Sequence, residues 1–418
     1  MLLGKLYTKT LKTLLFNIKN PVFSSHSVKK TLPFTYTQSC TYVDVYMKWK
    51  QDPYFESIEH IHKSFELKPI IALKNFIARE PSGSIPISAV SKRGLEFDIH
   101  INVARFMRQY PSIFEEFTGP LYNLPWFRLT QEAVEIDKEE RRVYEDCRDD
   151  LREGLRRFIL MSREKVMHLK IIKGLEWYLG LPSDFLENPK VNLDGSFRFV
   201  EMEDGLKGLA VVESEGERVL SVLQRNAIKR GVYSGEPNEA IEFPLFPSQG
   251  LRLRRKIEDW LMDFQKLPYV SPYEDYSNLD PSTDLAEKRV VGFLHELLSL
   301  FVDHTVERKR LLCLKKQFGL PQKVHKAFER HPRMFYLSLK NKTCTAILKE
   351  AFRSKSAIPS HPLLNVRKRY IKLMKQSDRI LKSRRVNNRS VDQPNLLKDL
   401  DSEYEEDCRG RATADLSV

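Results

Sequence analysis

The sequence predicts a mainly α-helical fold with short β-hairpins, an α+β protein in which winged-helix-like units repeat and are joined by long helices. Three observations predict this fold class. A Gly-Leu-Pro motif between two apolar runs occurs twice, at 180–182 and 319–321. Alternating apolar residues follow the proline that closes each unit. Between the units, apolar residues recur at helical spacing amid mixed charges.

Two stretches show the helical part of the unit most clearly: "LKIIKGLEWYLGLPSDFLENP" (169–189) and "LLCLKKQFGLPQKVHKAFERHP" (311–332). Gly180 and Gly319 suit the left-handed residue that ends a helix, and the proline two positions later suits the first turn of the next helix. A third stretch, 87–111, shares the ending, because an apolar residue lies four positions before a proline in all three. The pattern predicts three copies of a helix–turn–helix pair.

Each predicted helix pair is followed by a predicted two-stranded ribbon. Residues 196–213 alternate on both sides of an Asp-Gly turn, 334–350 alternate around an Asn-Lys turn, and 113–130 form a looser version. The repeat-like units therefore cover about 85–135, 165–215 and 305–352. The alternative is ordinary helix–turn–helix packing with incidental hairpins.

Long charged helices are expected between these units. Residues 139–179 read as one solvated helix packed on one face, and 280–318 as another, with Ser282 or Thr283 as its cap. A helix within 251–275 begins with four cations and ends at Pro268.

Composition favours a polyanionic partner. The chain has 418 residues, 41% of them hydrophobic, enough for two or three domains or a repeat array. Lys and Arg outnumber Asp and Glu by 69 to 56, for a net charge of +13, which favours nucleic acid or an anionic membrane. The five cysteines are scattered without CxxC spacing, so free thiols in a reducing compartment fit best.

The first 43 residues predict an organelle transit peptide. They contain no Asp or Glu, six lysines and many hydroxyl residues, and their leucines can form one apolar face. The amphipathic first turns favour the mitochondrion, with the chloroplast as the alternative. A disordered basic arm remains a second interpretation. The binding domain for the polyanionic partner is expected over 44–355.

The C-terminal end divides by charge. A basic extension is expected over 356–390, since 361–390 hold ten Lys or Arg and one acid. Residues 391–418 hold eight acids and three bases, which predicts an acidic disordered tail. This tail either has no role or folds back on the basic surface as a nucleic-acid mimic.

The sequence offers no convincing catalytic or metal site. His60 and His62 lie two positions apart and would face different sides of a helix, Asp98 and His100 share that spacing by accident, and His295-Glu296 lacks the second histidine of a zinc helix. Cys313 or Cys344 could pair with His325 or His331, but buried structural cysteine is the better interpretation. No phosphate-binding loop is present. We expect a binder without cofactor or metal, not an enzyme.

The basic surface is the stronger candidate site. Residues 305–355 hold fourteen Lys or Arg and three Glu. Lys316, Lys323, Lys326 and Arg330 recur at intervals that can share one helical face, where they would contact RNA phosphates. The candidate RNA-binding residues are Arg128, Arg198, Arg252, Arg254, Arg255, Lys256, Lys315, Lys316, Lys323, Lys326, Arg330 and Arg333.

Aromatic residues of the predicted ribbons are candidates for stacking on unpaired bases. They are Trp126, Phe127, Phe197, Phe199, Phe335 and Tyr336. Core packing is the expected role for most of them. Arg128 and Arg198, beside them on the strands, are better candidates for exposure.

Several long blocks resemble the plant organelle RNA recognition family, also called the PORR or What's This Factor family. The blocks include "MKWKQDPYFESIEHIHKSFELKPI", "LRRFILMSREKVMHLKIIKGLEWYLGLPSDF" and "FGLPQKVHKAFERHPRMFYLSLK". They match in order from Met47 to Phe352, most of the chain. The resemblance implies a land-plant protein sent to chloroplasts or mitochondria, where it binds intron RNA and supports group II intron splicing. It supplies no set of base-reading residues.

Two functions follow as hypotheses. The first is an organellar RNA-binding protein that holds a group II intron in a splicing-competent shape by phosphate and single-strand contacts, possible partners being other splicing factors. The second is a non-enzymatic scaffold that binds other proteins of a splicing or ribosome-associated complex.

Overall fold

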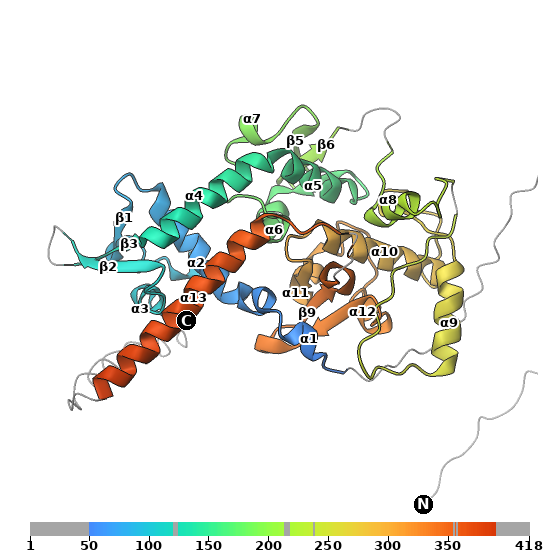
Figure 1. The fold of residues 1–418 in the computed structure, drawn as a ribbon. Helices are drawn as coiled ribbons and strands as arrows, with labels where there is room; N and C mark the ends of the chain where they lie inside the picture. The colour runs from blue at the N-terminus through green and yellow to red at the C-terminus, as the bar shows by residue number, and fades with distance from the viewer. Residues whose placement is uncertain are drawn as a thin grey trace, which may run out of the picture. The chain divides into compact units, whose positions relative to one another are not determined.

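Three small antiparallel sheets, separated by helices, organise the chain (Figure 1). The computed structural model describes residues 50–119, 124–212, 218–236, 239–353, 356 and 358–389. The fold mixes helices with short antiparallel sheets, so the predicted α+β class is confirmed. The predicted transit peptide and the acidic tail lie outside the described residues.

The first sheet follows helices α1 (Pro53–Glu56) and α2 (Glu59–Arg79). It contains β1 (Ser84–Pro86), β2 (Phe114–Thr118) and β3 (Pro125–Leu129), with β3 in the middle. Between β1 and β2 lie η1 (Ile87–Ala89), η2 (Gly94–Phe97) and α3 (Val103–Arg108). In this register Ile85 pairs with Phe127, and both side chains are buried.

The second sheet follows α4 (Gln131–Asp146) and α5 (Arg148–Leu160). Strand β4 (Val166–His168) leads directly into α6 (Leu169–Leu179), and α7 (Pro189–Asn192) precedes the hairpin of β5 (Phe197–Glu201) and β6 (Lys207–Val211). Helices α8 (Val222–Lys229) and α9 (Arg255–Lys266) follow. The sheet order is β4-β6-β5.

The third sheet repeats this order as β7-β9-β8. Helix α10 (Asp284–Leu300) precedes β7 (Thr305–Glu307), which leads into α11 (Arg308–Leu314) and then α12 (Lys326–Arg330). Strands β8 (Phe335–Ser338) and β9 (Thr345–Leu348) enclose η3 (Lys340–Lys342), and η4 (Lys349–Phe352) follows. Each sheet thus has a short first strand, followed by helical turns and then a hairpin.

The short first strands contradict two of the predicted long helices. Residues 139–179 contain the end of α4, then α5, β4 and α6, and 280–318 contain α10, β7 and α11. A residue with positive φ comes shortly before each first strand: Gly83 at 63°, Lys165 at 55° and His304 at 52°. A left-handed residue reverses the chain and cannot continue a helix. Each predicted ribbon is therefore part of a three-stranded sheet.

The predicted helix ends are confirmed. Gly180 and Gly319 have φ of 72° and 56° after α6 and near the turn that follows α11. A Cβ at Gly180 would lie 2.6 Å from Val302 Cγ2, so both the conformation and the space require glycine. Thr283 caps α10, because its hydroxyl accepts a hydrogen bond from the Ala286 amide at 3.2 Å.

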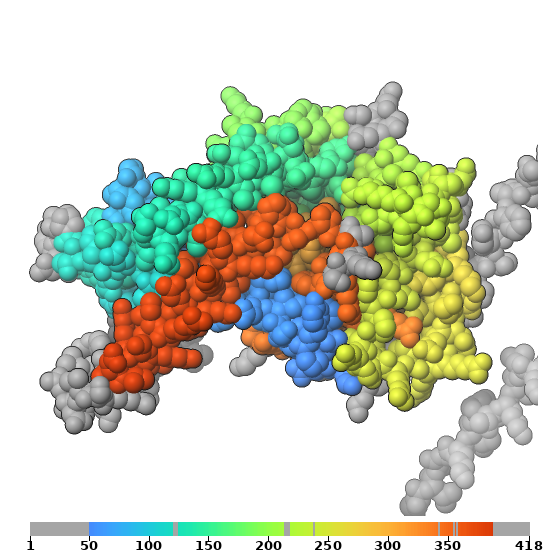
Figure 2. Space-filling view, in the orientation of Figure 1, coloured from blue at the N-terminus to red at the C-terminus, as the bar shows by residue number. Residues whose placement is uncertain are grey.

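The core forms two main apolar clusters. One extends from α5 and the second sheet through α8, α9 and α10 to the third sheet. The other joins the first sheet, α2 and α4 to the helix α13 (Leu363–Arg389). Figures 1 and 2 show α13, in red, lying along α4 and α2.

Helix α13 occupies most of the segment predicted as a basic extension. Its Tyr370 and Met374 are buried in the second cluster, and Ser377 accepts a hydrogen bond from the Ser112 amide at 3.1 Å. Its cations Lys368, Lys372 and Arg379 are exposed on the other side. One face of the basic helix therefore contributes to the core.

Candidate nucleic-acid interface

The predicted cationic ridge of the third unit does not form on one helix. Lys316 and Lys323 are exposed but lie outside α11 and α12, in the turns around Gly319. Lys326 begins α12 and is exposed. The helical spacing was misleading because Gly319 and Pro321 interrupt the helix and only five residues form α12.

Two predicted RNA contacts of this region have structural roles instead. Arg330 Nη1 lies 2.6 Å from Glu287 Oε2, and its guanidinium lies over the Trp260 ring at 5.3 Å. Arg333 Nη2 lies 2.8 Å from Glu258 Oε1. Lys315 is half-exposed and donates to Gln322. Arg330 and Arg333 are therefore less available to a phosphate than Lys316, Lys323 and Lys326.

The predicted arginines of the strands differ from each other. Arg128 is exposed, as expected, but it forms two hydrogen bonds of 2.9 Å with the Glu115 carboxylate on the neighbouring strand. Arg198 is exposed, and the part of the chain that the structure describes records no ion pair for it. Of the aromatic candidates, Phe127, Phe335 and Tyr336 are buried in the core, whereas 47% of Phe199 is exposed.

The four cations at the start of α9 are all exposed. Arg252, Arg254, Arg255 and Lys256 form no ion pair within the described ranges. Positive charge is unfavourable beside the amide groups at a helix N-terminus, so these side chains do not stabilise α9. They remain candidates for an anionic partner.

The cysteine interpretation is wrong for one residue. Cys313 is exposed and Cys344 is partly buried, so Cys313 has no structural role in the core. His331 is buried and lies 2.8 Å from Glu287 Oε1 through its Nε2 atom, so it pairs with a carboxylate. No cluster of three potential metal ligands occurs among the residues that the structure describes. None of the described helices is both long and apolar enough to cross a membrane.

A cationic surface that the sequence analysis missed lies where the second and third units meet. Lys170, Lys173 and Gly174 of α6 are exposed and follow the i, i+3, i+4 spacing of one helical face, which Trp177 extends by one turn. Lys309 and Arg310 of α11 are exposed as well. We call these five exposed residues, Lys170, Lys173, Gly174, Lys309 and Arg310, the α6–α11 face.

The two helices of this face are close in space. A Cβ added to Gly174 would lie 3.9 Å from Arg310 Nη1, and the Val302 amide donates a 2.8 Å hydrogen bond to the Tyr178 carbonyl. Among the described residues, none of the four cations of the face forms an ion pair. Their charge is therefore available to an external anion.

One further cation lies at the base of the face. Lys68 of α2 is 3.3 Å from Glu307 Oε1, and its ammonium lies over the Tyr178 ring at 4.7 Å. Burial lowers the pKa of Lys68, the Glu307 carboxylate opposes this shift, and the nearby Arg310 lowers the pKa further. Lys68 and Arg310 therefore interact electrostatically, with the Glu307 carboxylate beside Lys68.

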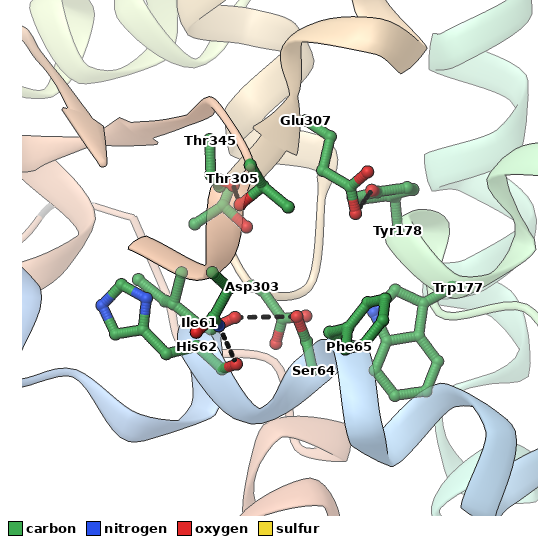
Figure 3. A pocket seen from close by; sticks show the side chains of 12 residues that line it. Ile61, His62, Ser64, Phe65, Trp177, Tyr178, Asp303, Thr305, Glu307 and Thr345 are labelled. Carbon is green, nitrogen blue, oxygen red and sulfur yellow. Dashed lines mark hydrogen bonds between the residues drawn. The ribbon is translucent and has the colours of Figure 1, made fainter. Parts of the chain in front are cut away.

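A small polar pocket opens beside these residues (Figure 3). It has a volume of about 20 Å³. Ser64 and Phe65 line it from α2, Trp177 and Tyr178 from α6, and Thr305, Glu307 and Thr345 from the third sheet (Figure 3). Asp303 lines it as well. The pocket thus combines aromatic rings with hydrogen-bonding groups next to the α6–α11 face.

Comparison with known proteins decides the family. The sequence profile described as plant organelle RNA recognition domain matches residues 50–379. The chain belongs to this family. The predicted resemblance is confirmed, and the match extends beyond Phe352 into α13.

The relatives of this PORR protein include proteins of both plant organelles. It is 64% identical to Protein WHAT'S THIS FACTOR 9, mitochondrial, of Arabidopsis thaliana. The 370 aligned residues cover 88% of this chain and 95% of that protein. It is 26% identical over 326 residues to Protein WHAT'S THIS FACTOR 1, chloroplastic, of Zea mays, covering 76% of this chain and 65% of that protein. The predicted mitochondrial localisation is confirmed by the first of these relatives. No solved structure matches the chain.

A more distant relative is Protein ROOT PRIMORDIUM DEFECTIVE 1 of Arabidopsis thaliana. It is 25% identical over 329 residues, which cover 75% of this chain and 80% of that protein. The α6–α11 face and the pocket both lie inside the matched PORR domain.

Proposed function

We propose that this chain binds organellar intron RNA in mitochondria and supports the splicing of group II introns, as an RNA-binding protein and not as an enzyme. The observation that carries the proposal is the α6–α11 face. Four exposed cations converge there from two units without an ion-pair partner in the described chain. The family to which the chain belongs gives the class of nucleic acid.

The α6–α11 face suits a phosphate backbone. Lysine and arginine side chains that neutralise phosphates release condensed counterions, which supplies affinity without reading the sequence. At Gly174 no side chain stands between Lys170 and Trp177. Outside its own helix, the nearest described atom to the Cβ it lacks is Arg310 Nη1, at 3.9 Å. Glycine inside an exposed helix lowers stability. Close approach of an RNA backbone to α6 accounts for this glycine better than packing does.

The three sheets with their helices form three winged-helix-like units in this proposal. Support comes from the shared strand order, the short first strand after a left-handed residue, and the closing hairpin. In the second and third units, α6 and α11 occupy the same place, directly after the first strand. The proposed RNA face therefore combines corresponding helices of two units.

In this proposal the protein positions the intron and takes no part in the chemical reaction. Contacts with phosphates hold two segments of the intron near each other, and the RNA performs the chemistry of splicing. Cations distributed over several units, including those at the start of α9 and in the α11–α12 turns, extend the same electrostatic surface.

The proposal is tested with the purified mature chain and a transcribed mitochondrial group II intron. We expect the logarithm of the binding constant to fall linearly with the logarithm of salt concentration, with a steep slope. In plants lacking the protein, we expect unspliced intron to accumulate in mitochondria and the wild-type gene to restore splicing. Salt-independent binding, or no retention of RNA at low salt, contradicts the proposal and favours the protein scaffold.

A further inference from the structure

The pocket beside the α6–α11 face contains a hydrogen-bond acceptor without a donor. Asp303 is 3% exposed, and its Oδ2 atom accepts a 2.7 Å hydrogen bond from Arg367 Nη1. Its other oxygen, Oδ1, is buried and has no hydrogen-bond partner in the described chain. A buried carboxylate oxygen that lacks a donor is costly, so it is most often satisfied by a ligand or by water.

The position of Asp303 is fixed by its surroundings. Arg367 also donates a 2.6 Å hydrogen bond to the Trp177 carbonyl, and its guanidinium stacks on the Trp177 ring at 3.8 Å. Burial lowers the pKa of the nearby His60 to about 4, so this ring is neutral at pH 7 and supplies no positive charge to the carboxylate. Asp303, which lines the pocket, is thus held rigidly with one unsatisfied acceptor atom.

The rim of the pocket carries an exposed aromatic ring. Phe65 is 55% exposed, although the other large apolar residues of its helix are buried, as Leu67 and Ile70 are, or partly buried, as Phe76 is. The α6–α11 face lies next to it through Lys68 and Arg310. An exposed ring beside phosphate-binding cations is the arrangement on which unpaired bases stack.

Size limits what the pocket can admit. A volume of about 20 Å³ accommodates a group as large as one water molecule, not a whole base. The exocyclic amino group of a base has this size and donates hydrogen bonds. Carboxylate side chains pair with such amino groups in nucleic-acid recognition.

We infer that this pocket reads one unpaired base that carries an exocyclic amino group, with the base stacked on Phe65 and its amino group donating to Asp303 Oδ1. Cytosine, adenine and guanine meet this requirement, and uracil does not. The inference rests on the proposed RNA-binding function and adds selectivity to it, because the α6–α11 face alone would bind all sequences alike.

The test compares labelled oligocytidylate and oligouridylate of about ten nucleotides by fluorescence anisotropy at low salt. These pyrimidines have the same size and differ at the group that would enter the pocket. A hydrogen bond to a charged group corresponds to a preference for cytosine of about tenfold or more. The same preference should disappear when wild-type protein binds an oligomer of 2-pyrimidinone riboside, which is cytidine without its amino group.

Asp303→Asn tests the protein side of the contact. Arg367 can only donate, so the asparagine oxygen should face Arg367 and the amide NH₂ should replace Oδ1. We expect the preference for cytosine to be lost or reversed towards uracil, whose O4 atom accepts, while the salt dependence stays unchanged. Asp263→Asn, an exposed carboxamide substitution on α9, is the control and should change neither property.

Phe65→Ala tests the stacking contact. It should weaken the binding of both oligomers by a similar factor, about 5-fold to 100-fold, and keep their ratio. Phe199→Ala, which removes another exposed ring outside the pocket, should have a smaller effect. A thermal melt of each variant shows whether it folds. The comparison with the 2-pyrimidinone oligomer tests the contact with the amino group on the wild-type protein, without any variant.

The outcomes separate the two proposals. If neither oligomer nor intron RNA binds at low salt, the proposed function itself is wrong. If both oligomers bind equally with a steep salt dependence, RNA binding stands and base selection by Asp303 is wrong. A cytosine preference that Asp303→Asn leaves unchanged, in a folded variant, also overturns the assignment of Asp303.

Discussion

Removing the positive charge of the α6–α11 face should weaken RNA binding more than removing equal charge elsewhere. The perturbation is the triple variant Lys170→Ala, Lys173→Ala and Arg310→Ala. All three side chains are exposed and none forms an ion pair among the described residues, although the Lys173 charge acts on the nearby Glu176 and lowers its pKa. The variant should therefore keep the stability of the wild type to within about 0.5 kcal/mol for each surface substitution.

The magnitude follows from counterion release. Each phosphate contact with single-stranded RNA contributes about 0.7 to the slope of log K against log salt. At about 0.1 M salt this amounts to about 1 kcal/mol per contact, so three contacts correspond to about 3 kcal/mol. The triple variant should bind about 100-fold more weakly. Its salt slope should be smaller than that of the wild type by about 2.

The assay is fluorescence anisotropy with one intron fragment over a range of salt concentrations. The control variant Lys92→Ala, Lys138→Ala and Arg142→Ala removes the same formal charge from exposed positions on the first unit and α4. It should change the affinity by less than about threefold, through the long-range field alone. Equal losses of affinity and slope in both variants would refute the reasoning, because net charge and not the face would then determine binding.

Four further predictions concern the same surfaces and the core. Gly174→Ala should stabilise α6 by about 0.5–1 kcal/mol in urea unfolding while it weakens RNA binding, and unchanged binding would argue against close approach at this glycine. Charge reversal of Lys316, Lys323 and Lys326 should reduce RNA affinity without loss of stability. Arg330→Ala should instead lower the free energy of unfolding by about 1–3 kcal/mol, because Glu287 loses one of its two partners and keeps only His331; thermal melts and RNA-binding anisotropy, measured on both variants, distinguish the two effects. Lys74→Met should lower the free energy of unfolding by about 3–5 kcal/mol, because the Asp137 and Glu140 carboxylates, 2.6 and 2.7 Å from the buried ammonium, would lose their partner. Adding Asp137→Asn and Glu140→Gln, which remove these two charges, should recover part of the loss. Burial raises the pKa of the Glu176 carboxyl from 4.5 to about 7, so the folded state binds this proton more tightly than the unfolded state and stability falls as pH rises from about 4.5 to 7. Glu176→Gln should therefore be more stable than the wild type at about pH 8 and equally stable at about pH 4. Equal stability of the two proteins at every pH would contradict burial of Glu176 as the cause.

Helix ends were predictable from local chemistry. Gly180 and Gly319 take the left-handed conformation at the places that their sequence context indicates, and Thr283 caps α10 with its own hydroxyl. Each of these features depends on a few neighbouring residues. The α+β class followed because the alternating runs after each closing proline do form hairpins.

The first strand of each sheet was not predictable in this way. Strands β1, β4 and β7 have three residues each, too few to show an alternating pattern. They become strands because β3, β6 and β9 lie beside them, which is a tertiary effect. Lys165 and His304 give no warning either, because non-glycine residues seldom adopt positive φ.

The predicted site failed where its charges have partners inside the fold. Spacing placed Arg330 on an RNA-binding ridge, and Arg333 was a candidate in the same basic run, but Glu287 and Glu258 come from distant segments and pair with them. Lys349, counted in the same basic run, is buried and donates to the Phe246 carbonyl at 3.2 Å. Sequence reports the sign of each charge but not whether folding brings it a partner.

The α6–α11 face could not be predicted either, because it depends on which distant cations the fold brings together. Lys170 and Lys173 belong to a stretch whose mixed charges suggested a solvated helix, and Arg310 lies more than a hundred residues later. The sequence nonetheless shows how the two helices correspond. The stretches "KIIKGLEWYLGLP" and "KRLLCLKKQFGLP" have the same length, begin with lysine and end with Gly-Leu-Pro. Lys170 therefore corresponds to Lys309. The buried Ile172 and Leu175 correspond to the buried Leu311 and Leu314. Two copies of one unit that pack with these helices adjacent present equivalent lysines to the same ligand, and an RNA strand, whose phosphates also repeat, is the ligand that such a repeated arrangement fits.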